Sequence, residues 1–238
     1  MRHLWVVLAI LTLVMGAYTN CSTQEDTSQS TASIQRSTTC SPPPGVSASP
    51  QTIEQAVALL NSLPLPVTVP CFVESLARPL DINATYSTAS AQPAVGSESP
   101  RIFIFKGPLI ISVAPNGSGA NFIEFGLIKS YGQTLKGEVH MPLYNTISPS
   151  TPYDRIEGGG TTSCTGCHSG EIQDKSITFA KAYLSKALRP FANFKVHSSA
   201  LKNERNLCGN TKNYRCDMLR AIYDHGTVND KEFPSTVP

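Results

Sequence analysis

Two cysteines and a histidine stand within five residues of this chain, in the segment Cys164-Thr165-Gly166-Cys167-His168. In a helical turn, residues three and four apart share a face, so Cys164, Cys167 and His168 would project to one side. Two thiols so placed can bond the two vinyl groups of a haem while the imidazole ligates the iron. The spacing therefore predicts one covalently attached haem c.

This segment resembles the attachment site of c-type cytochromes, which implies thioether bonds at Cys164 and Cys167 and a proximal iron ligand at His168. The resemblance covers the motif and a helical surround. The whole chain is similar, more loosely, to uncharacterised bacterial envelope proteins with one such motif. A zinc site, a redox dithiol and a structural disulfide are the alternatives. Zinc would need a second ligand pair, and Cys208 and Cys216 are too far apart for the usual spacing. A dithiol is expected after a strand, whereas this motif follows three glycines.

The second axial ligand of such an iron is less clearly marked in the sequence. Met218 comes first because a thioether suits electron transfer, with His197 and His225 as the alternatives. Each also has a simpler interpretation. Met218 lies among apolar residues of a predicted helix, His197 lies in a predicted loop, and His225 lies in a last helical turn, where its charge would complement the helix dipole.

The first twenty residues are typical of an export signal. A short basic start precedes an apolar run over 4–16, which has signal-peptide length and is too short to span a bilayer. Cys21 then resembles the acylated cysteine of bacterial lipoproteins, so we predict a signal peptide over 1–20 and lipidation of Cys21. Tyr18 and Asn20 depart from the usual lipoprotein pattern, which leaves secretion with a free Cys21 as the alternative. Ser22, by analogy with lipoprotein sorting, favours the outer membrane, facing the periplasm.

The cysteine count agrees with an oxidising compartment. Of seven cysteines, Cys21 is assigned to lipid and the motif pair to haem, which leaves Cys40, Cys71, Cys208 and Cys216. An even remainder in an exported protein indicates two disulfides. Three pairings are possible, and Cys40–Cys71 with Cys208–Cys216 requires the simplest topology.

Charge gives no sign of a nucleic-acid partner. The formal net charge of the whole chain is +2, and removal of the predicted signal peptide would take away Arg2 and leave a net charge of +1. The predicted partners are the membrane, through the lipid at Cys21, and a redox protein whose identity the sequence does not reveal.

The chain is predicted to be α+β, with an N-terminal antiparallel β-rich module followed by a small helical c-type haem domain. Residues 21–50, rich in Ser, Thr and Pro, are predicted to be a disordered tether. The β-rich module spans 51–157, with a helix over 52–63 capped by Thr52 and an extended segment over 65–73. Its strands are predicted over 101–114, with a bend at Gly107-Pro108, and over 121–130 and 135–143. The haem domain spans 158–238, with helices over 176–188 and 213–225.

Together these features predict an exported monohaem protein that transfers single electrons in the cell envelope and is an electron carrier more than a catalyst. Two alternatives stay open. An open sixth position on the iron would allow a catalyst or sensor of peroxide, nitric oxide or oxygen. Without haem, the protein would be a non-enzymatic envelope lipoprotein that binds through its β-rich module.

Overall fold

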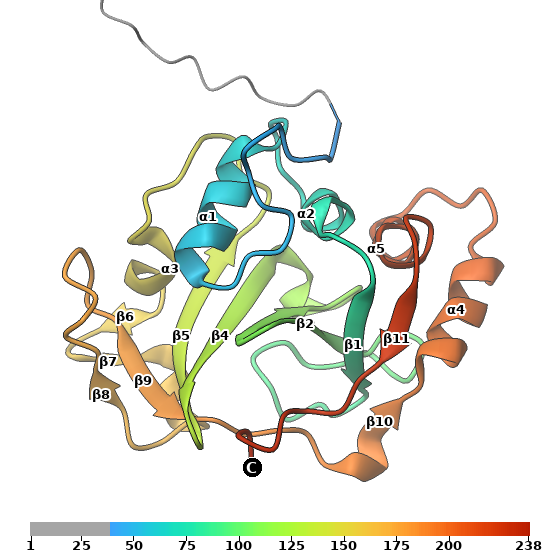
Figure 1. The fold of residues 1–238 in the computed structure, drawn as a ribbon. Helices are drawn as coiled ribbons and strands as arrows, with labels where there is room; N and C mark the ends of the chain where they lie inside the picture. The colour runs from blue at the N-terminus through green and yellow to red at the C-terminus, as the bar shows by residue number, and fades with distance from the viewer. Residues whose placement is uncertain (1–38) are drawn as a thin grey trace, which may run out of the picture. The chain divides into compact units, whose positions relative to one another are not determined.

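The structure is a computed structural model that describes residues 39–238, all of which belong to one compact unit (Figure 1). The predicted signal peptide, Cys21 and the first part of the predicted tether lie outside the described residues. The α-helices are α1 (Ile53–Ser62), α2 (Val69–Ser75), α3 (Thr151–Asp154), α4 (Ser198–Leu207) and α5 (Tyr214–Tyr223). The 3-10 turns are η1 (Ser118–Asn121), η2 (Ser163–Gly166) and η3 (Ala192–Phe194).

One large, mostly antiparallel sheet organises the fold, which confirms the α+β class. Its strands are β1 (Leu80–Thr85), β2 (Arg101–Lys106), β3 (Leu109–Val113), β4 (Phe122–Ser130), β5 (Gln133–His140), β8 (Ile172–Gln173), β9 (Tyr183–Lys186), β10 (Lys195–Val196) and β11 (Val228–Asp230). The order is β10-β1-β2-β3-β4-β5-β9-β8, and β11 pairs with β1 in parallel. A separate ribbon joins β6 (Glu157–Gly158) to β7 (Thr161–Thr162).

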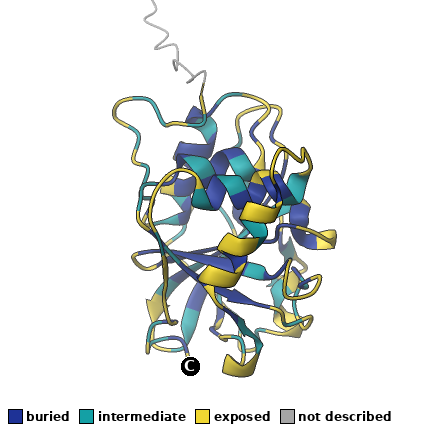
Figure 2. Ribbon diagram, turned by 90° about the vertical axis from the view of Figure 1, so that its right-hand side faces the viewer, coloured by how far each residue is buried: buried dark blue, intermediate teal, exposed yellow. Residues whose placement is uncertain are grey.

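Helices α1, α2 and α5 cover one face of the sheet and form the main core with it (Figure 1). Successive side chains of a strand point to opposite faces, so Ile102 and Ile104 of β2 enter this core. Figure 2 shows that buried residues concentrate on the strands and the inner sides of the helices, whereas the connecting loops are exposed.

The opposite face of the sheet carries a second, smaller core and a polar area. Phe103 and Phe105 of β2 pack edge-on against Phe233 from the C-terminal segment. Arg101, further along the same face of β2, donates hydrogen bonds to Ser112 of β3 and to Glu124 of β4. This polar area lies next to the cysteine motif, since Arg101 and Glu124 both interact electrostatically with Cys164.

Several sequence predictions are confirmed. Helix α1 matches the predicted helix, and the Thr52 hydroxyl accepts a hydrogen bond from the Gln55 amide as its N-cap. The predicted strand over 101–114 is a hairpin, because Gly107 adopts a positive φ of 58° and reverses the chain between β2 and β3. The remaining predicted strands correspond to β4 and β5, and the last predicted helix to α5.

Two local predictions are wrong. The segment 65–73 ends in helix α2 instead of staying extended, because Thr68 caps the helix and Pro70 lies in its first turn, where proline is tolerated. The predicted helix over 176–188 contains strand β9, which pairs with β5. Every second residue there is buried, at Tyr183, Ser185 and Ala187, which is the period of a strand. Pairing with β5 therefore outweighs the helical spacing of the apolar residues.

The two ends of the described chain join the same unit. In the segment predicted as the end of a tether, Cys40 and Val46 pack against the main core. The segment 158–238, predicted as a helical domain, supplies helices α4 and α5 and also strands β8, β9, β10 and β11 of the sheet. Within residues 39–238, no helix has the length and apolar character needed to cross a membrane.

Candidate functional site

The cysteine motif forms a tight helical turn on the polar side of the sheet. The carbonyl of Cys164 accepts hydrogen bonds from the amides of Cys167, at 3.2 Å, and His168, at 2.8 Å. The second bond is the i to i+4 bond of an α-turn, so Cys164 and His168 lie on the same side of the turn. Cys164 is half-buried, Cys167 is exposed, and both thiols are free.

Glu171 ties the two ends of this turn together. Its carboxylate accepts hydrogen bonds from the Thr161 hydroxyl at 2.5 Å, the Thr162 amide at 2.7 Å, and the Thr162 hydroxyl. The Thr162 hydroxyl in turn accepts a hydrogen bond from the Cys164 amide and caps the turn. A chain of polar contacts therefore runs from Glu171 through Thr162 to the first cysteine.

The imidazole of His168 is oriented by strand β9, which lies between β5 and β8 in the sheet. His168 Nδ1 lies 2.7 Å from the carbonyl oxygen of Lys186, and the Lys186 amide donates to the carbonyl of Ser169 at 3.2 Å. A carbonyl only accepts, so Nδ1 carries the ring proton and Nε2 keeps its lone pair. Burial, followed by the charge of Lys136, lowers the pKa of His168 to about 4, so the ring is neutral at neutral pH.

Charged side chains of the sheet lie beneath the motif. Lys136 of β5 places its Nζ 3.5 Å from His168 Nδ1, and burial lowers its pKa to about 8, which leaves it mostly protonated at neutral pH. Arg101 and Glu124 form an ion pair alongside. Burial also raises the pKa of the Cys164 thiol, more than the nearby charge of Lys136 lowers it.

These residues fit the attachment of a c-type haem. Metal-ligating histidines usually donate their other ring N–H to a carbonyl or a carboxylate, which is the bond that His168 makes to Lys186. Two free thiols lie in the same turn as this ring. No group of three or more His, Cys, Asp or Glu side chains with the geometry of a metal site occurs among residues 39–238. A zinc centre in that part of the chain thus has no ligand set.

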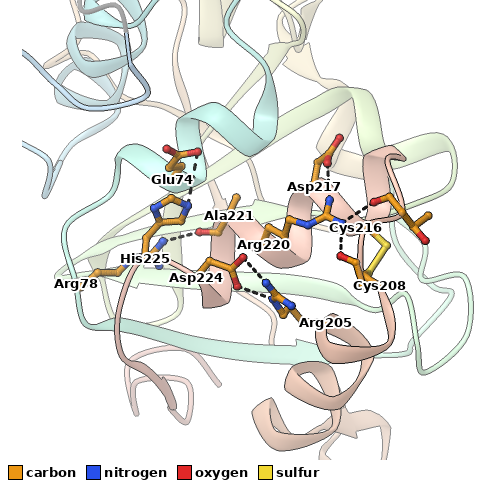
Figure 3. A network of polar contacts seen from close by, with 12 residues as sticks. Glu74, Arg78, Arg205, Cys208, Cys216, Asp217, Arg220, Ala221, Asp224 and His225 are labelled. Atoms are coloured by element: carbon orange, nitrogen blue, oxygen red, sulfur yellow. Dashed lines mark hydrogen bonds and ion pairs between the residues drawn. A yellow bond between two sulfur atoms is a disulfide. The ribbon is translucent and has the colours of Figure 1, made fainter.

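The three tentative second ligands have other surroundings. Met218 of α5 is fully buried in the main core. His197, with a side chain 69 % exposed, lies 3.8 Å from the carboxylate of Asp230. His225 Nε2 lies 3.7 Å from the carboxylate of Glu74. Figure 3 shows the two side chains facing each other. The structure therefore brings Cys164, Cys167 and His168 together in one turn. None of the three tentative second ligands makes a contact with that turn in the described part of the chain.

The other four cysteines form the simplest of the three possible pairings. Disulfides join Cys40 to Cys71 and Cys208 to Cys216. The first ties the start of the described chain to α2, and the second joins α4 to α5 (Figure 3).

A cleft of about 690 Å³ lies between α2 and α5, and each of its charged residues has a partner of opposite charge in the cleft or beside it. Arg220 donates to Asp217 and to the carbonyls of Gly209 and Thr211, while Arg205 holds Asp224 with two hydrogen bonds (Figure 3). Helix α5 thus presents a satisfied polar surface here.

Sequence reasoning missed Glu171 and Lys186, which hold the motif, and Lys136, whose charge lies beside His168. Glu171 follows the motif closely, and a carboxylate next to two threonines could have indicated a loop clamp. Lys186 contributes its backbone carbonyl, which carries no sequence signal. Lys136 is distant in sequence and reaches His168 only because β5 pairs with β9.

Comparisons of this chain with protein-family models, with curated proteins and with solved structures found no match.

Proposed function

We propose that this protein carries one covalently attached haem c and transfers single electrons in the cell envelope. The observation that carries this proposal is the hydrogen bond from His168 Nδ1 to the Lys186 carbonyl, in a turn that also holds two free cysteines. This bond leaves Nε2 as the ring atom available to a metal.

The residues have separate roles in this proposal. Cys164 and Cys167 would hold the porphyrin by thioether bonds, which keep the group attached in a compartment where it is not replaced. His168 Nε2 would be the proximal iron ligand, and the haem would supply one-electron redox chemistry. Glu171 and Lys186 act as positioning residues, because they fix the turn and the ring without offering a side chain to the metal.

The rival interpretations of the motif receive less support. A redox dithiol needs an activated thiolate with a lowered pKa, whereas burial raises the pKa of Cys164. Zinc needs further ligands, and residues 39–238 contain no such cluster.

The test is a haem stain after denaturing electrophoresis. The full chain is expressed with a cytochrome c maturation system, beside a double variant with Cys164→Ala and Cys167→Ala. We expect a stain that survives denaturation in the wild type and is lost in the double variant. Well-folded exported protein without stain would refute covalent haem attachment.

We also propose export and a lipid anchor at Cys21, on the outer membrane and facing the periplasm. Support comes from the basic start, the apolar run and the position of Cys21 in the sequence. Metabolic labelling with a fatty acid should mark the wild type and leave a Cys21→Ser variant unmarked. An unmarked wild type that is exported and cleaved would overturn the anchor and keep export.

One observation favours a second candidate function, the binding of a small molecule such as peroxide, nitric oxide or oxygen. Met218 is fully buried in the main core, and His197 and His225 lie beside carboxylates elsewhere. If no side chain of the protein fills the sixth position, that position is open to such molecules. A high-spin five-coordinate spectrum of the haem-loaded protein would support this candidate, and a low-spin six-coordinate spectrum would support electron transfer.

A further inference from the structure

Lys136 is a charged group placed directly against the candidate haem ligand. Its Nζ lies 3.5 Å from His168 Nδ1, on strand β5 beneath the motif. The Nδ1 proton is directed to the Lys186 carbonyl at 2.7 Å, so this nitrogen has no lone pair to accept from the ammonium. The contact therefore brings a positive charge to the ring without the compensation of a hydrogen bond.

The carboxylates around this position are engaged with other groups. Glu124 is paired with Arg101, and Glu171 accepts its hydrogen bonds from Thr161 and Thr162. Within residues 39–238, Lys136 forms no ion pair with a carboxylate at salt-bridge distance. The ammonium of Lys136 thus lies 3.5 Å from the ring without a carboxylate partner at salt-bridge distance.

Strand pairing holds this arrangement in place. β5 carries Lys136, and its neighbour β9 carries the carbonyl that orients His168. Thr134 and Ser185 face each other across this pair, and both are buried, so the two strands are closely packed at this point. The lysine stem is held by the sheet and not by an exposed loop, and solvent screens a charge in this half-buried position less than an exposed one.

We propose that Lys136 raises the reduction potential of a haem iron held by His168. With haem bound, one electron supplied by a redox partner protein would remove one unit of positive charge from the iron, and no bond or proton of the protein would change. A fixed cation beside the ligand ring therefore stabilises the reduced form more than the oxidised form. This inference rests on the proposed function, because it requires haem on His168.

The experiment compares midpoint potentials of the haem-loaded full chain by spectroelectrochemical titration. Lys136→Met removes the charge and keeps most of the stem, and Lys136→Arg keeps the charge. Lys186→Met is the matched control, since it removes an exposed lysine charge near His168 and leaves the backbone carbonyl in place. At an effective dielectric constant of about 20, a charge this close changes the reduction equilibrium on the order of ten-fold or more.

We expect K136M to lower the midpoint potential, corresponding to an equilibrium shift of at least about ten-fold. K136R should stay close to the wild type, and K186M should shift the potential by less than a third of the K136M effect. Equal potentials in K136M and the wild type, or equal shifts in K136M and K186M, would overturn the proposal.

The outcomes separate this inference from the proposed function. Absence of covalent haem in the wild type would contradict the proposed function. A haem-loaded K136M protein with an unchanged midpoint potential would contradict only the role of Lys136. If K136M fails to fold, Lys136→Gln replaces it, with far-ultraviolet circular dichroism as the folding check and the same expected direction of shift.

Discussion

The clamp formed by Glu171 can be tested in the protein without haem. Replacing Glu171 by Ala removes three hydrogen bonds, one from the Thr161 hydroxyl and two from Thr162. A net contribution of about 1 kcal/mol for each gives about 3 kcal/mol of local stability at the motif. Since 1.4 kcal/mol corresponds to a factor of ten, the turn should open about 100-fold more often in E171A.

Labelling of the half-buried Cys164 thiol measures this opening. In a background with Cys21→Ser and Cys167→Ser, Cys164 is the remaining free thiol of the chain once the two disulfides have formed. We expect a thiol reagent to modify Cys164 about 100-fold faster in E171A than in the background protein, following the factor derived above. Mass spectrometry of the labelled protein gives the rate.

Glu157 supplies the matched control for this measurement. Its carboxylate accepts one hydrogen bond from the Gly160 amide, at 3.2 Å, in the same loop. Loss of about 1 kcal/mol predicts an increase of about five-fold for E157A. The reasoning is refuted if E171A accelerates labelling no more than E157A while circular dichroism shows both variants folded.

Three further predictions concern stability. Met218→Ala should lower the free energy of unfolding, measured in urea, by about 2–5 kcal/mol, because Met218 is fully buried. Met218→Leu should lower it by less than about 1.5 kcal/mol and leave the haem spectrum unchanged. Replacing both Cys208 and Cys216 by Ser should lower the same free energy by about 2–3 kcal/mol, as expected for a short loop. Hydrogen bonds from Lys231 and Asn229 lower the pKa of Asp81 in the folded protein. The contribution of Asp81 to the free energy of unfolding is therefore present above its unfolded pKa and is lost as the pH falls through the lower folded pKa. Urea midpoints of Asp81→Asn and the wild type should converge at acidic pH.

Distinct results would contradict each of these. A changed haem spectrum in Met218→Leu would make Met218 an iron ligand and would place the main core near the haem. An unchanged urea midpoint after loss of the Cys208–Cys216 bond would mean that this disulfide does not constrain the unfolded chain. A wild-type midpoint that does not approach that of Asp81→Asn on acidification would exclude the stated role of Asp81.

Local features of the fold could be predicted because their causes are local. Thr52 caps α1 with a hydroxyl three residues before the amide it binds, and Gly107 reverses the chain between β2 and β3. The turn at Cys164 closes on itself through its own backbone bonds. The cysteine count left three disulfide pairings possible, and the structure has the one that requires the simplest topology.

Non-local pairing decided what the sequence could not predict. The residues over 176–188 have helical spacing, but the edge of the sheet beside β5 offers unpaired backbone groups, and β9 satisfies them. The same pairing brings the Lys186 carbonyl and the Lys136 ammonium to His168. The sequence by itself determined the spacing of Cys164, Cys167 and His168, on which the proposed haem attachment rests. Only the tertiary structure decided how His168 is oriented and which charge lies beside it, because those contacts join strands that are far apart along the chain.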